Sequence, residues 1–142
     1  MGVFPDPWGW RRRRMAGLHF SCDDWMGGDK SANSLLDIIQ KELTAFVTEE
    51  EKPAWRKQFL APFIRQSRFR QLKLKPEMMR AIVEPLLRYR DALVQRLGLP
   101  DSDADPTGDW GDDAWRLYCV RDLLCGNEVC QRTGKPIIIC FA

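Results

Sequence analysis

The only histidine of this chain lies close in sequence to a thiol and two acids, residue types that can do nucleophilic chemistry: His19, Cys22, Asp23 and Asp24. A reactive thiol needs a base within hydrogen-bond reach and an acid that orients the base. Residues 17–22, however, alternate apolar and polar side chains, which predicts a short strand. Positions three apart in a strand point to opposite faces, so we expect no Cys–His pair and assign no catalytic residue.

A run of aspartates has the spacing of a calcium-binding loop. Positions 1, 3, 5, 9 and 12 of a twelve-residue loop are held by Asp101, Asp103, Asp105, Asp109 and Asp112. The segment resembles an EF-hand over this loop only. The sharp turn at the sixth position needs glycine, whereas this chain has Pro106, and the last position lacks the longer, bidentate Glu. We therefore interpret the run as a solvated acidic turn and expect no bound metal.

The cysteines point to no metal or cofactor site. There are five, with no CxxC pair, and a single histidine is too few for the usual zinc sites. We interpret them as small core residues and expect no cofactor. Residues 1–14 carry four consecutive arginines without the apolar run of a secretory leader, and no stretch approaches the roughly eighteen apolar residues of a membrane span. The expected location is the cytoplasm, with no membrane partner.

Charge is polarised along the chain although the formal net charge is only +2. Residues 52–90 hold eleven Lys and Arg against two Glu, while residues 101–113 hold six Asp and no base. Aromatic side chains are interleaved with the basic ones, as in proteins that bind single-stranded nucleic acid: Trp55, Phe59, Phe63, Phe69 and Tyr89. Because Phe59 and Phe63 fall on a predicted apolar stripe, they are expected in the core, where they cannot stack on bases.

The apolar periodicity predicts helices between two strands. Leu35 to Val47 recur at three- and four-residue steps, Thr48 to Glu51 matches a capping box that opens a second helix, and Pro62 should kink or break it. A third helix should run from Pro76 to Gly98 and a fourth from Asp112 to Gly134. Residues 68–75 could form an edge strand or a basic connection, and the β-branched run at 137–141 predicts a buried strand.

The predicted fold is therefore α+β and predominantly helical, with about four helices packed on a small sheet formed by strands near the two termini. Residues 1–14 are expected to be a flexible basic leader, and residues 15–142 a single globular domain of ordinary size.

The sequence favours a non-catalytic protein that binds another protein, for example an immunity-type or inhibitor protein acting on a toxin or enzyme, because segregated charges can steer a complementary partner. Candidate contact residues come from the acidic loop, the basic segment and two tryptophans: Asp101, Asp103, Asp105, Asp109, Trp110, Trp25, Arg65, Arg68, Arg70 and Lys73. A nucleic-acid-binding module using residues 52–90 is the first alternative, and an enzyme of unrecognised class is the second. The oligomeric state is left open.

Overall fold

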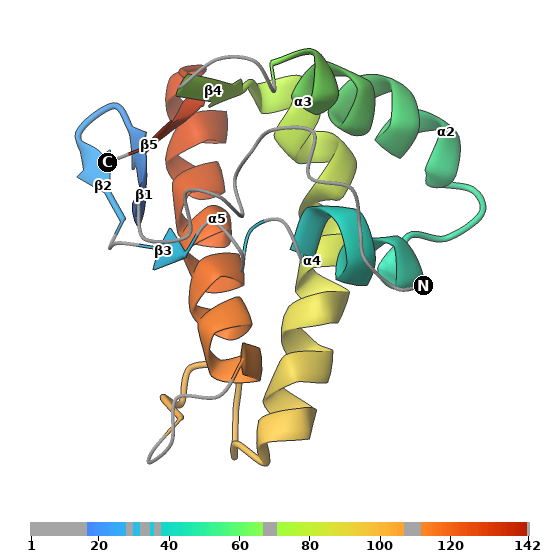
Figure 1. Cartoon of the computed structure of the whole chain (residues 1–142), viewed down its shortest axis with the longest axis vertical. Coiled ribbons are helices and arrows are strands. Elements are labelled where there is room, and N and C mark those ends of the chain that lie inside the picture. The colour runs from blue at the N-terminus through green and yellow to red at the C-terminus, as the bar shows by residue number, and fades with distance from the viewer. Residues whose placement is uncertain are drawn as a thin grey trace.

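The computed structural model describes residues 17–27, 30–31, 35, 38–66, 71–106 and 112–141. Its architecture is α+β with helix dominating, as the sequence predicts, and the helices pack against a small antiparallel sheet (Figure 1). The predicted basic leader, residues 1–14, lies outside the described residues.

The two predicted terminal strands form and pair with each other. β1 (Gly17–Cys22) lies antiparallel to β5 (Ile137–Phe141), with Phe20 opposite Ile139. The sheet is larger than predicted, because β4 (Gln71–Leu74) pairs with the other side of β5. β2 (Trp25–Met26) and β3 (Lys30–Ser31) both pair with β1, so the order is β2-β1-β5-β4 with β4 at one end.

One face of this sheet supplies a large part of the core. Alternate residues of the three longer strands are buried wherever their burial is described, which is the period of a half-buried strand: Leu18, Phe20, Cys22, Leu72, Leu74, Ile137 and Ile139. The sequence left open whether residues 68–75 form an edge strand or a basic connection. The buried Leu72 and Leu74 belong to an edge strand, β4. The intervening Lys73 of this edge strand is exposed, as is Lys75 directly after it.

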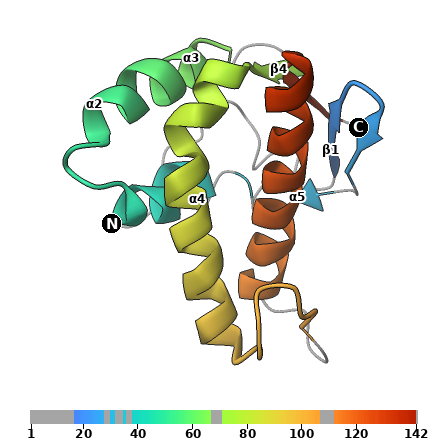
Figure 2. The ribbon, with the colours of Figure 1, turned by 180° about the vertical axis from the view of Figure 1, so that it is seen from behind.

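Two long helices run side by side. α5 packs against the sheet, and α4 packs against the other side of α5 in both views (Figures 1 and 2). α4 (Pro76–Leu97) begins with proline at its first position and ends at Gly98, whose φ of 69° is left-handed. The amide of Gly98 donates to Gln95 O at 3.1 Å and the next amide to Val94 O at 3.1 Å, so the helix ends in a Schellman motif. α5 (Asp112–Thr133) begins and ends where its sequence predicts.

The predicted capping box forms before the second helical stretch. Thr48 N donates to Glu51 Oε1 at 2.9 Å, and Glu51 N donates to Thr48 Oγ1 at 3.2 Å. The stretch comprises α2 (Lys52–Ala54), π-turns over Trp55–Leu60 and α3 (Ala61–Arg65). It continues through Pro62 instead of breaking. A proline ring clashes with the carbonyl four residues earlier, and the wider π-turns before it give the ring room.

The expected count of about four helices is slightly too high, since the described residues form three. The first predicted helix is represented by a π-turn at Ile38–Glu42 followed by a 3₁₀ turn at Leu43–Phe46, and no side chain caps the 3₁₀ turn. The β-branched Ile38, Ile39 and Thr44 lower the helix propensity of this stretch. Among the described members of its apolar stripe, Leu35, Ile39, Leu43 and Val47 are nevertheless buried, and Phe46 is half-buried.

Candidate functional site: a cationic groove beside strand β4

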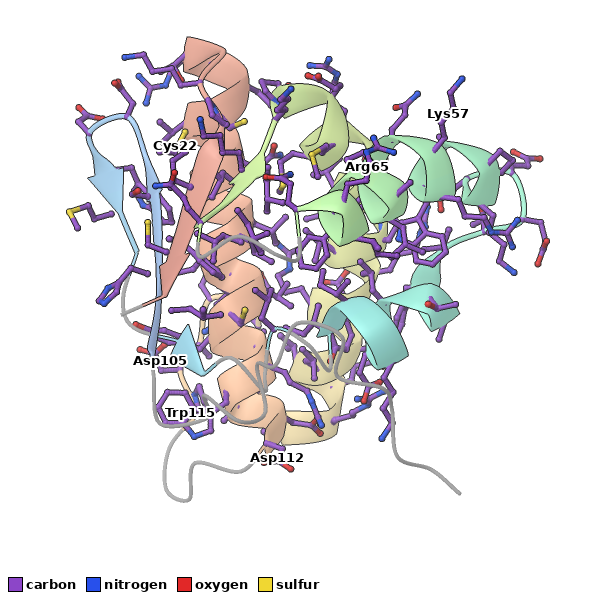
Figure 3. The ribbon with its side chains drawn as sticks, turned by 45° about the horizontal axis from the view of Figure 1, so that its top comes forward. Cys22, Lys57, Arg65, Asp105, Asp112 and Trp115 are labelled. Atoms are coloured by element: carbon purple, nitrogen blue, oxygen red, sulfur yellow. The ribbon has the colours of Figure 1, made fainter. Side chains whose placement is uncertain are left out.

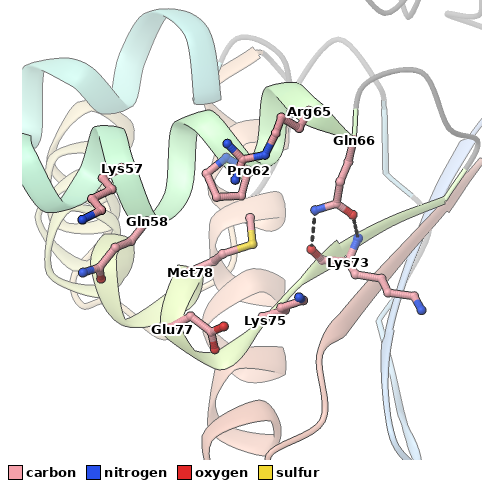
Figure 4. A pocket seen from close by; sticks show the side chains of 9 residues that line it. All are labelled: Lys57, Gln58, Pro62, Arg65, Gln66, Lys73, Lys75, Glu77 and Met78. Carbon is pink, nitrogen blue, oxygen red and sulfur yellow. Dashed lines mark hydrogen bonds between the residues drawn. The ribbon is translucent and has the colours of Figure 1, made fainter.

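A groove of about 480 Å³ runs between the second helical stretch, the outer side of β4 and the beginning of α4 (Figure 4). Its size is in the usual range for small ligand sites. Nine residues line it: Lys57, Gln58, Pro62, Arg65, Gln66, Lys73, Lys75, Glu77 and Met78. Two of the predicted contact residues, Arg65 and Lys73, are therefore brought together by the fold.

The groove is positively charged. Lys57, Arg65 and Lys75 are exposed around it, and Glu77 is the only carboxylate among the lining residues that the structure describes. No ion pair to a carboxylate holds any of these three cations within the described part of the chain. The side chain of Lys73 extends away from the groove, which it borders with its backbone (Figure 4). Unpaired cations around a concave surface favour an anionic ligand.

The lining also has an apolar part. Met78 is buried and Pro62 is half-buried, and both lie between the flanking cations (Figure 4). A partner that fits this groove therefore presents apolar groups next to acidic ones.

Gln66 fastens the end of α3 to β4. Its carboxamide nitrogen donates to Lys73 O at 2.8 Å, and its carboxamide oxygen accepts from Lys73 N at 2.7 Å (Figure 4). The side chain thus satisfies both backbone groups of one residue on the outer side of the edge strand. Nothing in the sequence signals this pairing, because it depends on where the chain returns after residue 66.

Two other cations of residues 52–90 are paired with carboxylates. Arg88 binds Glu51 through two hydrogen bonds of 2.6 and 3.0 Å, and Lys52 binds Glu49 at 2.6 Å. Hydrogen bonds from Arg88 and from Thr48 lower the pKa of Glu51 to about 2. Arg88 and Lys52 are therefore neutralised by neighbouring carboxylates, whereas Lys57, Arg65 and Lys75 of the groove have no such ion pair in the described structure.

The acidic loop lies at the opposite end of the molecule. Figure 3 shows Lys57 and Arg65 at one end and Asp105 and Asp112 at the other. Asp101, Asp103 and Asp105 are exposed, the last with 91% of its side chain. The predicted contact residues Asp109 and Trp110 lie outside the described residues, as do Arg68 and Arg70 of the basic segment.

Arg121 of α5 organises the described part of the acidic loop. Its guanidinium donates to Ser102 O, to Ala104 O at 2.8 Å and to Asp105 Oδ1 at 3.4 Å. Of these three oxygens only Asp105 Oδ1 is at a ligand position of a calcium loop, so a calcium ion there would compete with the guanidinium for that one oxygen.

Trp25, predicted as an aromatic anchor for a partner, is half-buried against the core. A Cβ added at Gly126 of α5 would lie 2.9 Å from its ring, so the indole lies on that glycine. The ring fixes the short β2 strand to α5, and less of it is free for a partner than the sequence suggests.

The aromatic residues of the basic segment point inward. Trp55, Phe59, Phe63 and Tyr89 are all buried, and the rings of Phe59 and Phe63 stack at 5.6 Å. Stacking on bases needs accessible rings. Phe69 lies outside the described residues.

The imagined Cys–His pair is separated as the strand geometry requires. Cys22 is buried on the core face of β1, where it donates to Lys135 O at 3.3 Å, whereas His19 lies on the opposite, half-buried face. Burial raises the pKa of the Cys22 and Cys130 thiols, which keeps both protonated and unreactive. Cys125 is an exposed residue, but the pKa of its thiol is also raised. Partial desolvation of the thiol is the main cause, and the nearby acids Asp122 and Glu128 add to it.

Within the residues described, no group of three or more His, Cys, Asp or Glu side chains is placed to hold a metal ion. None of the described helices is long and apolar enough to cross a bilayer.

No family model, no curated protein and no solved structure matches this chain. The proposed function therefore rests mainly on the groove.

Proposed function

We propose that this chain is a non-catalytic binding protein whose cationic groove takes an acidic region of another protein. The observation that carries the proposal is the convergence of Lys57, Arg65 and Lys75, none paired with a carboxylate in the described structure, around an apolar lining. An immunity-type or inhibitor protein that blocks a toxin or enzyme is the role that best suits such a surface. We place this role in the cytoplasm, where its five free thiols would persist.

The two-ended charge distribution supports a partner with a local acidic surface. Positive charge gathers at the groove and negative charge at the loop of residues 101–106, so the molecule is oriented as it approaches a complementary protein. A long, uniform polyanion would be attracted by one end and repelled by the other. The low net charge of +2 further weakens long-range attraction to nucleic acid.

Nucleic-acid binding through residues 52–90 is the second candidate. The groove cations would suit phosphates, but the buried Trp55, Phe59 and Phe63 remove the stacking surface that would hold bases. Such binding would rest on phosphate contacts alone and would weaken steeply with salt.

Charge reversal tests the proposal. One variant carries Lys57→Glu, Arg65→Glu and Lys75→Glu. The control carries Lys41→Glu, Arg56→Glu and Arg132→Glu, at exposed positions away from the groove. Each reversal removes two charge units, so three take either protein from +2 to −4, and the net charge is matched.

Affinity capture from the native host then compares the three proteins. We expect wild type and control to retain the same stoichiometric acidic protein and the groove variant to lose it. Equal capture by the groove variant would refute the proposal. Capture of nuclease-sensitive material that elutes at moderate salt would select the nucleic-acid alternative instead.

A further inference from the structure

β4 is the end strand of the described sheet, and half of its backbone groups face away from β5. In an antiparallel pair, residues alternate between directing both N–H and C=O toward the partner strand and directing both away. Lys73 directs both groups outward, to Gln66. By the same alternation Gln71 faces outward, while Leu72 and Leu74 pair with Ile139 and Ile137 of β5.

The carboxamide of Gln66 makes the hydrogen bonds that a neighbouring strand would make. Like a peptide group it offers one C=O and an N–H, and it uses them on the N–H and C=O of a single edge residue at 2.7 and 2.8 Å. A side chain is tethered by several rotatable bonds, so an incoming backbone can replace it and restore both hydrogen bonds. The Gln66 carboxamide thus occupies the hydrogen-bonding position of a neighbouring strand on the sheet edge, and we call it the placeholder.

The groove lies along this same edge, since Gln66, Lys73 and Lys75 are among its lining residues (Figure 4). A strand placed there would direct alternate side chains to the two faces of the sheet. One set would meet Pro62 and Met78, and the other would lie among the flanking cations. The groove therefore suits an extended segment in which acidic and apolar residues alternate.

We propose that the partner binds by strand addition: an extended acidic segment displaces the Gln66 carboxamide and pairs with the outer edge of β4. This inference rests on the proposed function and specifies how the same groove would hold its ligand. Main-chain hydrogen bonds would supply affinity, and the cations would select acidic sequences.

The test uses a short fluorescein-labelled peptide that alternates glutamate with valine, with binding followed by fluorescence anisotropy. Two further peptides carry N-methyl groups on one or the other set of alternate backbone nitrogens. Strand addition requires only the N–H groups that face β4. We therefore expect one methylated peptide to lose at least tenfold in affinity and the other to keep it. Equal affinities for both would overturn strand addition.

Variants at Gln66 test the placeholder. Gln66→Ala frees the edge, so the peptide no longer competes with the carboxamide, and we expect a Kd about tenfold lower, which corresponds to about 1.4 kcal/mol. Gln95→Ala removes an exposed carboxamide of α4 that does not line the groove and should leave the Kd unchanged. If Gln66→Ala fails to fold, Gln66→Asn, whose shorter side chain reaches less far, takes its place.

An independent measurement needs no variant. The Gln66 side-chain amide signals of the wild-type protein should move to solvent-exposed positions in the ¹H–¹⁵N spectrum when the peptide binds. Unmoved signals at saturation, or dimerisation of Gln66→Ala without tighter peptide binding, would overturn the inference. In the second case the carboxamide serves only to keep the edges of two copies apart.

The two proposals fail in different ways. In one outcome the triple charge reversal abolishes peptide binding, while neither N-methylation of the peptide nor substitution of Gln66 changes the affinity. That outcome supports the acidic-partner function and refutes strand addition. If the triple reversal leaves peptide affinity unchanged, the groove is not the binding site and both proposals fall.

Discussion

Replacing Tyr89 by phenylalanine should stabilise the protein. The ring of Tyr89 is fully buried on α4 and lies 5.3 Å from that of Phe46, yet its hydroxyl has no hydrogen-bond partner within the described structure. Leaving a buried hydroxyl unsatisfied costs about 1–3 kcal/mol relative to its hydrated state. Tyr89→Phe removes that cost and keeps the ring contacts, so we expect a gain of about 1 kcal/mol in the free energy of unfolding.

Urea denaturation and calorimetry measure this gain. For a chain of 142 residues, the unfolding entropy of about 2.1 cal/mol/K per residue converts about 1 kcal/mol into a rise of roughly 3 °C in Tm. Tyr118→Phe, at a half-buried tyrosine on α5, is the matched control and should give no gain. A loss of more than about 1 kcal/mol for Tyr89→Phe would refute the reasoning, because it would mean that the hydroxyl is well bonded.

Alkaline pH supplies a second measurement of the same group. Burial first, and the nearby Glu42 second, raise the pKa of Tyr89 above the ordinary value of 10. Above pH 10 the unfolded chain therefore loses a proton that the folded chain keeps, and stability falls as pH rises. The phenylalanine variant lacks this loss, so its advantage over wild type should widen above pH 10.

Three further outcomes are expected. Because the pKa of Glu51 is held at about 2, its contribution to stability is present above its ordinary value of 4.5 and is lost as pH falls toward 2; Glu51→Gln should flatten the acid limb of a pH–stability curve from urea titrations. Arg121→Ala removes the donors that hold residues 101–106, so cleavage there by an Asp-specific protease should accelerate severalfold while Tm changes little. Gly126→Ala places a methyl group against the rigid Trp25 ring and should cost about 1–3 kcal/mol, with a shift in tryptophan fluorescence that a purely global effect on stability would not give.

Local sequence rules predict most of the described elements. The alternation at 17–22, the capping box at Thr48, and the Pro76 and Gly98 boundaries of α4 each depend on neighbouring residues, and each appears where predicted. The pairing of β1 with β5 also follows, because the backbone groups of two buried strands need hydrogen-bond partners and a neighbouring strand supplies them.

The candidate site was predicted less well, because it depends on contacts between distant segments. Arg65 and Lys73 were selected for charge alone, while Gln66, Pro62 and Met78 carry no sequence pattern that indicates a groove. Conversely, the ion pair between Arg88 and Glu51 removes a cation that charge counting treats as free. Partners separated along the chain decide which charges remain available.

The central position of β5 has a consequence for how the chain reaches this structure. β1 and β4 never touch each other within the sheet; each is aligned only by β5, the last of the described strands to be synthesised. Until residues 137–141 are synthesised, no strand aligns β1 with β4, which begins about fifty residues after β1 ends. Helices α4 and α5 can pair beforehand as a local hairpin, but the sheet forms only after β5 is synthesised. A nascent chain that stalls before β5 therefore exposes the unpaired edges of β1 and β4, which can pair with other chains and aggregate.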